Sequence, residues 1–200
     1  MRIKISILLL ILGLILVFLP LSGKYSLHGS PAKLLTQAID PSTYMTPDQV
    51  AKAIVSEDST IRIFDLRSQS EFTRASIPGA INLPYSEFLK RDLESFLNSG
   101  VKNLFYSSND LEANYALILA RGLGYSESYV MKGGLEAWDR DIMNSTFSGD
   151  RISVRENALF ETRTRARKMF IEINSMPDSL KTKYRATLEV ERKKLDGGCE

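Results

Sequence analysis

The chain begins with an uninterrupted run of apolar residues. Residues 5–23 contain no charged side chain, and Arg2 and Lys4 precede them. About 20 apolar residues are needed to cross the hydrocarbon core of a bilayer. We therefore predict that residues 1–23 form a transmembrane anchor. The alternative is a cleaved signal peptide, which we disfavour because the run is long for a signal and Leu21 is too large for a cleavage site.

Positive charge is denser before this run than after it. Arg2, Lys4 and the terminal amine lie on one side, whereas Lys24 and Lys33 follow on the other. The cytoplasmic flanks of membrane helices are enriched in Lys and Arg. We therefore expect a single-pass protein of the inner (plasma) membrane, with its domain on the extracytoplasmic side. The lipid bilayer is then the partner of residues 5–23.

Short β-branched runs alternate with helical periodicity in the middle of the chain. The pattern predicts strands at Ile61–Phe64, Leu104–Tyr106 and Tyr129–Met131. The predicted helices are one turn at Ala32–Ile39, a helix after Thr46, and the segments Ser86–Phe96, Ala113–Leu123 and Leu135–Ile142. Strands that alternate with helices indicate a parallel sheet with helices on both faces. The fold class is therefore α/β, with residues 24–43 as a tether and residues 44–145 as the domain.

Two of these helices carry terminal signals. Thr46 is a good N-cap, Pro47 suits the first helical position and Gln49 completes a capping box. Gly124 follows the helix at Ala113–Leu123 and suits a left-handed C-cap.

Residues 146–200 form a charged helical extension. Pro177 divides it into two expected helices, the second of them highly charged. Residues 151–200 hold twelve Lys and Arg against eight Asp and Glu, so this extension is basic. The whole chain has a net charge of only +2, and we therefore do not expect nucleic acid as a partner. The extension either packs partly on the domain and frays beyond it, or is an arm that binds a protein partner or anionic head groups.

The chain has a single cysteine, Cys199, and a single histidine, His28. No intramolecular disulfide, cysteine-based metal site or Cys–His catalytic pair can be built from them, so we expect no metal and no cofactor. The Cys199 thiol has three alternatives. It is an inert exposed thiol, a disulfide or metal contact with a partner (including a disulfide-linked dimer), or a reactive thiol that accepts sulfur.

Four motifs follow one another through the domain. They are Asp65-x-Arg67 with Glu71-Phe72, Ile77-Pro-Gly-Ala-Ile-Asn-Leu-Pro84, Gly122-x-Gly124-Tyr125 and Lys132-Gly-Gly-Leu-Glu-Ala-Trp138. In this order and spacing, residues 44–142 resemble a rhodanese-like domain. The basic N-terminal anchor and the Gly-Gly-Cys end resemble membrane-bound bacterial members of that family. The resemblance implies a parallel sheet flanked by helices and membership of a sulfurtransferase family.

The resemblance also says where catalysis would occur. In catalytic members, the strand that matches Leu104–Tyr106 ends in a nucleophilic cysteine and a loop of the form Cys-x-x-Gly-x-Arg, whose N–H groups hold a persulfide. Here the cysteine position is Ser107, the glycine position is Asp110 and the arginine position is Glu112. A serine hydroxyl cannot carry sulfane sulfur as a persulfide, and two acids repel an anionic donor. We therefore expect no sulfurtransferase activity from this loop.

The loop has two other readings. Ser107, Ser108, Asn109, Asp110 and Glu112 could form a pocket, together with Asp65 and Arg67, for a cation or a basic peptide. Alternatively the loop residues cap the following helix, with Asp110 as N-cap or first-turn acid.

Asp65 and Arg67 have a structural reading as well. Asp65 then caps local backbone, and Arg67 pairs with a carboxylate such as Glu71. These readings favour a membrane-anchored, catalytically inactive module that binds an unidentified protein partner or acts as a scaffold. The alternative is a sulfurtransferase, of the thiosulfate sulfurtransferase kind, or a thiol-redox protein that uses Cys199.

Overall fold

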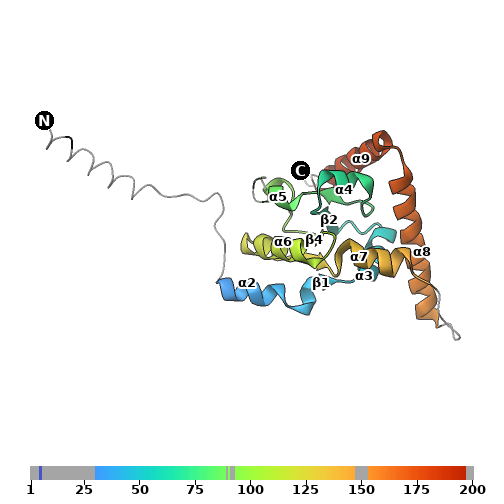
Figure 1. The fold of residues 1–200 in the computed structure, drawn as a ribbon, viewed down its shortest axis with the longest axis horizontal. Coiled ribbons are helices and arrows are strands. Elements are labelled where there is room, and N and C mark those ends of the chain that lie inside the picture. Colours follow the sequence, from blue (N-terminus) through green and yellow to red (C-terminus); the bar gives the residue numbers. More distant parts are fainter. Residues whose placement is uncertain (1–4, 6–29, 89, 91–92, 147–152, 197–200) are drawn as a thin grey trace.

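The protein is described from a computed structural model (Figure 1). The structure describes residue 5 and residues 30–88, 90, 93–146 and 153–196. Apart from Ile5, the predicted anchor at residues 5–23 lies outside the described residues, as do His28 and Cys199. In the part of the chain that the structure describes, no helix is both long and apolar enough to cross a membrane. The anchor therefore stays a prediction.

Within the described residues, a parallel sheet of five strands forms the centre of the molecule. In spatial order the strands are β1 (Tyr44–Met45), β5 (Ser128–Met131), β4 (Lys102–Tyr106), β2 (Ile61–Asp65) and β3 (Ile81–Asn82). The register of two neighbouring strands, β2 and the central strand β4, places Asp65 opposite Tyr106. The carboxyl ends of β2 and β4 therefore lie side by side, at the edge of the sheet where α/β proteins usually place their ligand sites.

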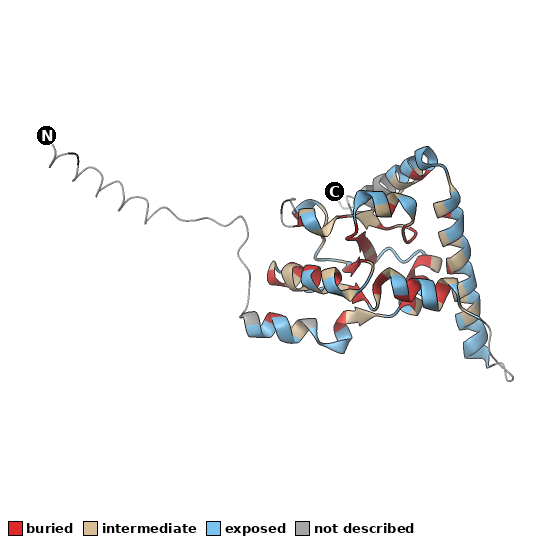
Figure 2. Ribbon diagram, viewed as in Figure 1, coloured by how far each residue is buried: buried red, intermediate tan, exposed pale blue. Residues whose placement is uncertain are grey.

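Helices cover both faces of this sheet (Figure 1). They are α2 (Pro31–Ala38), α3 (Pro47–Val55), α4 (Gln69–Arg74), α5 (Tyr85–Phe88), α6 (Asp110–Gly122), α7 (Gly134–Trp138), α8 (Val154–Ser175) and α9 (Asp178–Asp196), with short turns η1 (Pro41–Thr43), η2 (Leu93–Ser95) and η3 (Asp139–Met143). Side chains of α3, α4, α7, η3 and α8 share one hydrophobic cluster with the sheet, and those of α5 and α6 share a second. Figure 2 shows buried residues along the strands and on the inward sides of these helices. The α/β expectation is confirmed.

The terminal signals are also confirmed. Thr46 and Gln49 form a reciprocal capping box at the start of α3. Gly124 has a φ of 102°, the left-handed conformation that ends α6 and that residues with a Cβ rarely adopt.

Two predicted helices differ from the structure. The segment Ser86–Phe96 is not one helix: the chain makes the four-residue α5 and the 3₁₀ turn η2. Hydrogen bonds between residues three apart close two separate turns. Lys90 N–H donates to the Glu87 carbonyl (2.9 Å), and Phe96 N–H donates to the Leu93 carbonyl (3.0 Å). These short turns bring the apolar residues to the core without one continuous helix. The last predicted helix, Leu135–Ile142, divides into α7 and a single π-helical turn, η3.

The extension forms two helices that contact the domain. Ala166 and Ile173 of α8 are buried, and the Phe170 ring lies 6.2 Å from the Trp138 ring. Arg163 makes two 2.6 Å bonds to the Asp48 carboxylate at the start of α3. The helix α8 is therefore part of the wall around the core rather than a free arm.

Candidate functional site

The candidate site begins where β4 ends. Ser107 is buried, and its hydroxyl donates a hydrogen bond to the Glu112 carboxylate. Asn109 is the N-cap of α6, because its side-chain oxygen accepts the Leu111 N–H at 3.1 Å. Asp110 and Glu112 occupy the first turn, where acids favour the positive end of the helix dipole. The helix-capping reading thus holds for the loop, with Asn109 as the cap and Asp110 as a first-turn acid.

The same loop closes the start of α7. Leu135 N–H donates to the Ser107 carbonyl at 2.9 Å, and Glu136 N–H donates to the Ser108 carbonyl at 3.1 Å. Gly133 N–H donates to the Asp110 carboxylate. The first N–H groups of a helix have no partner within that helix. Here the loop supplies those partners.

Gly134 allows this close approach. Its φ is 56°, and an added Cβ would lie 2.6 Å from the Ser107 carbonyl oxygen and 2.7 Å from that of Ser108. Backbone atoms cannot move aside as a flexible side chain can. A residue with a Cβ at this position would therefore push α7 away from the loop.

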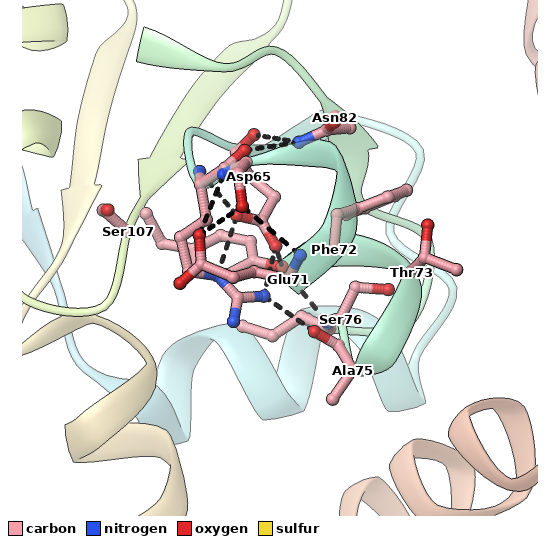
Figure 3. A network of polar contacts seen from close by, with 12 residues as sticks. Asp65, Glu71, Phe72, Thr73, Ala75, Ser76, Asn82 and Ser107 are labelled. Atoms are coloured by element: carbon pink, nitrogen blue, oxygen red, sulfur yellow. Dashed lines mark hydrogen bonds and ion pairs between the residues drawn. The ribbon is translucent and has the colours of Figure 1, made fainter. Parts of the chain in front are cut away.

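A second polar group lies beside the loop, on the opposite side of β4 (Figure 3). Arg67 Nε donates to Asp65 Oδ1 at 3.0 Å and its Nη2 donates to Asp65 Oδ2 at 2.5 Å. Tyr106 donates its hydroxyl proton to Asp65 Oδ2 at 2.6 Å. All three side chains are buried, so the ion pair is a desolvated, fork-shaped contact of the strong kind.

The expected pairing of Arg67 with Glu71 is wrong. Glu71 accepts hydrogen bonds from the backbone N–H of Ser68 (3.1 Å) and from its hydroxyl (2.5 Å), as the capping box of α4. The Ser68 hydroxyl bond also lowers the pKa of Glu71. Arg67 instead binds Asp65 and the Ala75 carbonyl, at 2.7 Å, because the buried Asp65 lies directly across its fork.

The predicted site residues therefore form two groups. Successive side chains of a strand point to opposite faces of the sheet. Tyr106 joins Asp65 and Arg67 on one face, whereas Ser107, the next residue, turns to Glu112. Tyr106 was not among the site residues predicted from the sequence. The alternation of side chains along β4, together with the register that places Tyr106 opposite Asp65, could have identified it.

Burial raises the pKa of the Tyr106 hydroxyl well above its ordinary value of 10.0, and the Asp65 carboxylate raises it further. The native state then holds this proton more tightly than the unfolded chain does. Its contribution to stability is complete below about pH 10 and is lost as the pH rises above that value.

We expect the free energy of unfolding of the wild-type protein to fall more steeply above about pH 10 than that of Tyr106→Phe. Urea titrations at a series of pH values measure both slopes. Parallel curves for the two proteins would show that Tyr106 does not titrate as described.

Two cavities border other parts of the domain. One, of about 570 Å³, lies between β2 and α9 and is lined by residues such as Ile61, Tyr184 and Leu188. The other, of about 930 Å³, is lined by residues that include Phe72, Asn82 and Arg185. None of the loop residues from Ser107 to Glu112 lines either cavity. Among the described residues, no group of three or more His, Cys, Asp or Glu side chains is placed to hold a metal ion.

Residues 46–141 match the family model for the rhodanese-like domain. The chain is also similar to the solved rhodanese-like domain of an Anabaena protein (23% identity, 56% of this chain and 90% of that chain, TM-score 0.45). A rhodanese-related protein from Thermoplasma volcanium is 20% identical, the match covers 49% of this chain and 91% of that chain, and the TM-score is 0.42. The human single-domain sulfurtransferase is 24% identical, the match covers 50% of this chain and 96% of that chain, and the TM-score is 0.44. No curated protein matches the chain. On the match of the family model, residues 46–141 form a rhodanese-like domain, of a family that comprises sulfurtransferases and some inactive scaffold modules.

Proposed function

We propose that this chain is a membrane-anchored, catalytically inactive rhodanese-like protein that acts as a protein-binding or scaffold module. One observation carries the proposal. The side chain at the end of β4 is a serine, Ser107, whose hydroxyl is bound to the Glu112 carboxylate.

The chemistry of this residue argues against sulfur transfer. A persulfide forms on a thiolate, and the single cysteine of the chain, Cys199, lies far along the sequence from the loop. Serine nucleophiles need an adjacent general base. Histidine occurs only at His28, before the domain begins.

The contacts of the loop argue against binding an anionic sulfur donor. The neighbouring N–H groups at the start of α7, those of Gly133, Leu135 and Glu136, are already occupied by the Asp110 carboxylate and by two loop carbonyls, so an anion at the loop cannot use them. Asp110 and Glu112 add two negative charges, which disfavour an anion such as thiosulfate. The same charges favour a basic segment of a partner, which is the protein-binding role that we propose for the loop.

The location completes the proposal. The charge-free run at residues 5–23, with Arg2 and Lys4 before it, supports a single-pass anchor in the inner (plasma) membrane and a domain on the extracytoplasmic side. In that compartment an unpaired Cys199 thiol can join two copies through a disulfide.

The full chain, purified from membranes, tests these statements in a thiosulfate:cyanide assay. We expect no thiocyanate above the buffer rate from the wild-type protein, because the loop lacks a thiol. Extraction of the membranes with alkaline carbonate should leave the chain in the pellet, since an anchor resists that treatment.

Cys199→Ser is the matched control. Turnover that is equal in the wild-type and variant proteins would contradict the inactive loop. Turnover that disappears in the variant would replace the proposal with the alternative, sulfur transfer or thiol-redox chemistry at Cys199. Release of the chain by carbonate would contradict the anchor.

A further inference from the structure

Two side chains of α9 hold this helix against the end of α4 (Figure 1). Lys181 Nζ donates to the Thr73 carbonyl at 3.1 Å, and Arg185 Nη2 donates to the Phe72 carbonyl at 3.3 Å. The last carbonyls of a helix have no partner within that helix, so both bonds satisfy groups that α4 leaves open. They also fix the position of the Arg185 guanidinium on the domain.

This guanidinium is half-buried and has no counter-ion among the described residues. It lies 4.1 Å from the centre of the Phe72 ring, and its Nη2 also donates to the Ser76 hydroxyl at 3.0 Å. No described carboxylate forms an ion pair with it, and its Nε and Nη1 have no hydrogen-bond partner in the described part of the chain. Burial lowers the pKa of Arg185, although arginine stays charged at neutral pH. A half-buried cation with free donors favours an anion as its ligand.

Arg185 borders the cavity of about 930 Å³, which has the size of a small-molecule site. Phe96 and Tyr125 contribute aromatic wall to this cavity. Arg62 and Glu94 border it as well, and Arg62 donates to the Phe96 carbonyl at 3.1 Å. Arg185 is therefore the group of this wall that we assign to an incoming anion.

The cavity beside Arg185 adjoins the cavity of about 570 Å³, because Arg62, Gly79 and Leu188 border both of them. Apolar side chains from α3, β2, α8 and α9 line much of this second cavity, among them Ile54, Ile61, Ile63, Met169 and Leu188. Leu188 stands three residues after Arg185, so one face of α9 presents a cation and then an apolar side chain.

Charge gives this pair of cavities a direction. Glu57 and Asp58 border the apolar cavity and disfavour an anion there, whereas Arg185 favours one in the other cavity. A ligand that uses both cavities therefore has an anionic head at one end and an apolar chain at the other.

We propose that the two cavities form one binding site for a free fatty acid, a single-chain amphiphile with a carboxylate head. The carboxylate accepts hydrogen bonds from Arg185, and the chain passes Leu188 into the apolar cavity. No residue of the loop from Ser107 to Glu112 borders either cavity, so this site stands or falls separately from the proposed function.

Titration calorimetry of the full chain in phosphatidylcholine nanodiscs tests the site, with decanoate as the probe and empty nanodiscs as the blank. We expect one decanoate to bind per chain. Decanol has the same chain without the charge and should bind about tenfold more weakly, and butyrate, which keeps the charge but lacks the chain, should not saturate the site. Arg185→Gln should bind decanoate about tenfold more weakly than the wild-type protein and should bind decanol equally well.

Lys183→Gln is the matched control, because it removes a positive charge from an exposed position on the same helix. It should bind decanoate as the wild-type protein does. Equal decanoate affinity in the wild-type protein and Arg185→Gln would overturn the site. If that variant does not fold, the wild-type protein decides: decanoate that binds no more tightly than decanol or butyrate rejects the proposal. A phospholipid retained in place of decanoate, identified by its mass in native mass spectrometry, would also reject it.

Discussion

Asp65→Ala is expected to lower the free energy of unfolding by about 3–5 kcal/mol. The substitution removes the carboxylate that accepts three bonds from Arg67, one of them from its backbone N–H, and one from Tyr106. Arg67 is buried, so its charge would remain without a counter-ion in a poorly solvated place. Urea unfolding followed by circular dichroism measures the loss.

An exposed pair provides the control for Asp65. Arg140 makes bonds of 2.8 and 2.9 Å to Asp141, but its side chain is 71% exposed. Pairs of this kind contribute at most about 1 kcal/mol, so Asp141→Ala should change stability little. Equal losses in the two variants would show that burial does not determine the strength of the Asp65 pair.

Gly134→Ala is expected to lower the free energy of unfolding by about 2–5 kcal/mol. Two costs add together. The residue would have to keep a φ of 56°, and its Cβ would stand 2.6 Å from the Ser107 carbonyl oxygen. The strain should open the bond from Leu135 N–H to that carbonyl, which amide exchange of Leu135 reports.

Gly124→Ala separates these two costs. Gly124 has a φ of 102°, and an added Cβ would meet no atom within 4 Å. Only the conformational cost, about 1–2 kcal/mol, should remain. A loss for Gly134→Ala no larger than that for Gly124→Ala would mean that the close approach of α7 to the loop does not limit the side chain there.

Signals that operate within a few residues were readable from the sequence. The capping box at Thr46, the left-handed Gly124 and the alternation of strands with helices all appear in the structure. Each depends on the backbone of one turn or on one repeating pattern. The periodicity of Ser86–Phe96 misled because apolar residues on two separate turns produce the same spacing as one helix.

Contacts between distant segments were harder to predict. Glu71 stands four residues after Arg67 and looked like its partner, although the Ser68–Glu71 spacing is itself a capping-box pattern that commits this carboxylate. The role of Tyr106 depends on the register of β4 against β2, which no local pattern specifies. The docking of α9 is polar, so hydrophobic periodicity could not reveal it.

The Trp138–Phe170 contact has a consequence for where this molecule can be divided. Trp138 is completely buried, and part of its cover comes from α8, which begins after the last residue matched by the family model. The unit recognised by homology is therefore smaller than the unit that folds. A truncation after residue 141 would expose to water the apolar surface that α8 covers, and exposed apolar surfaces of this kind promote aggregation.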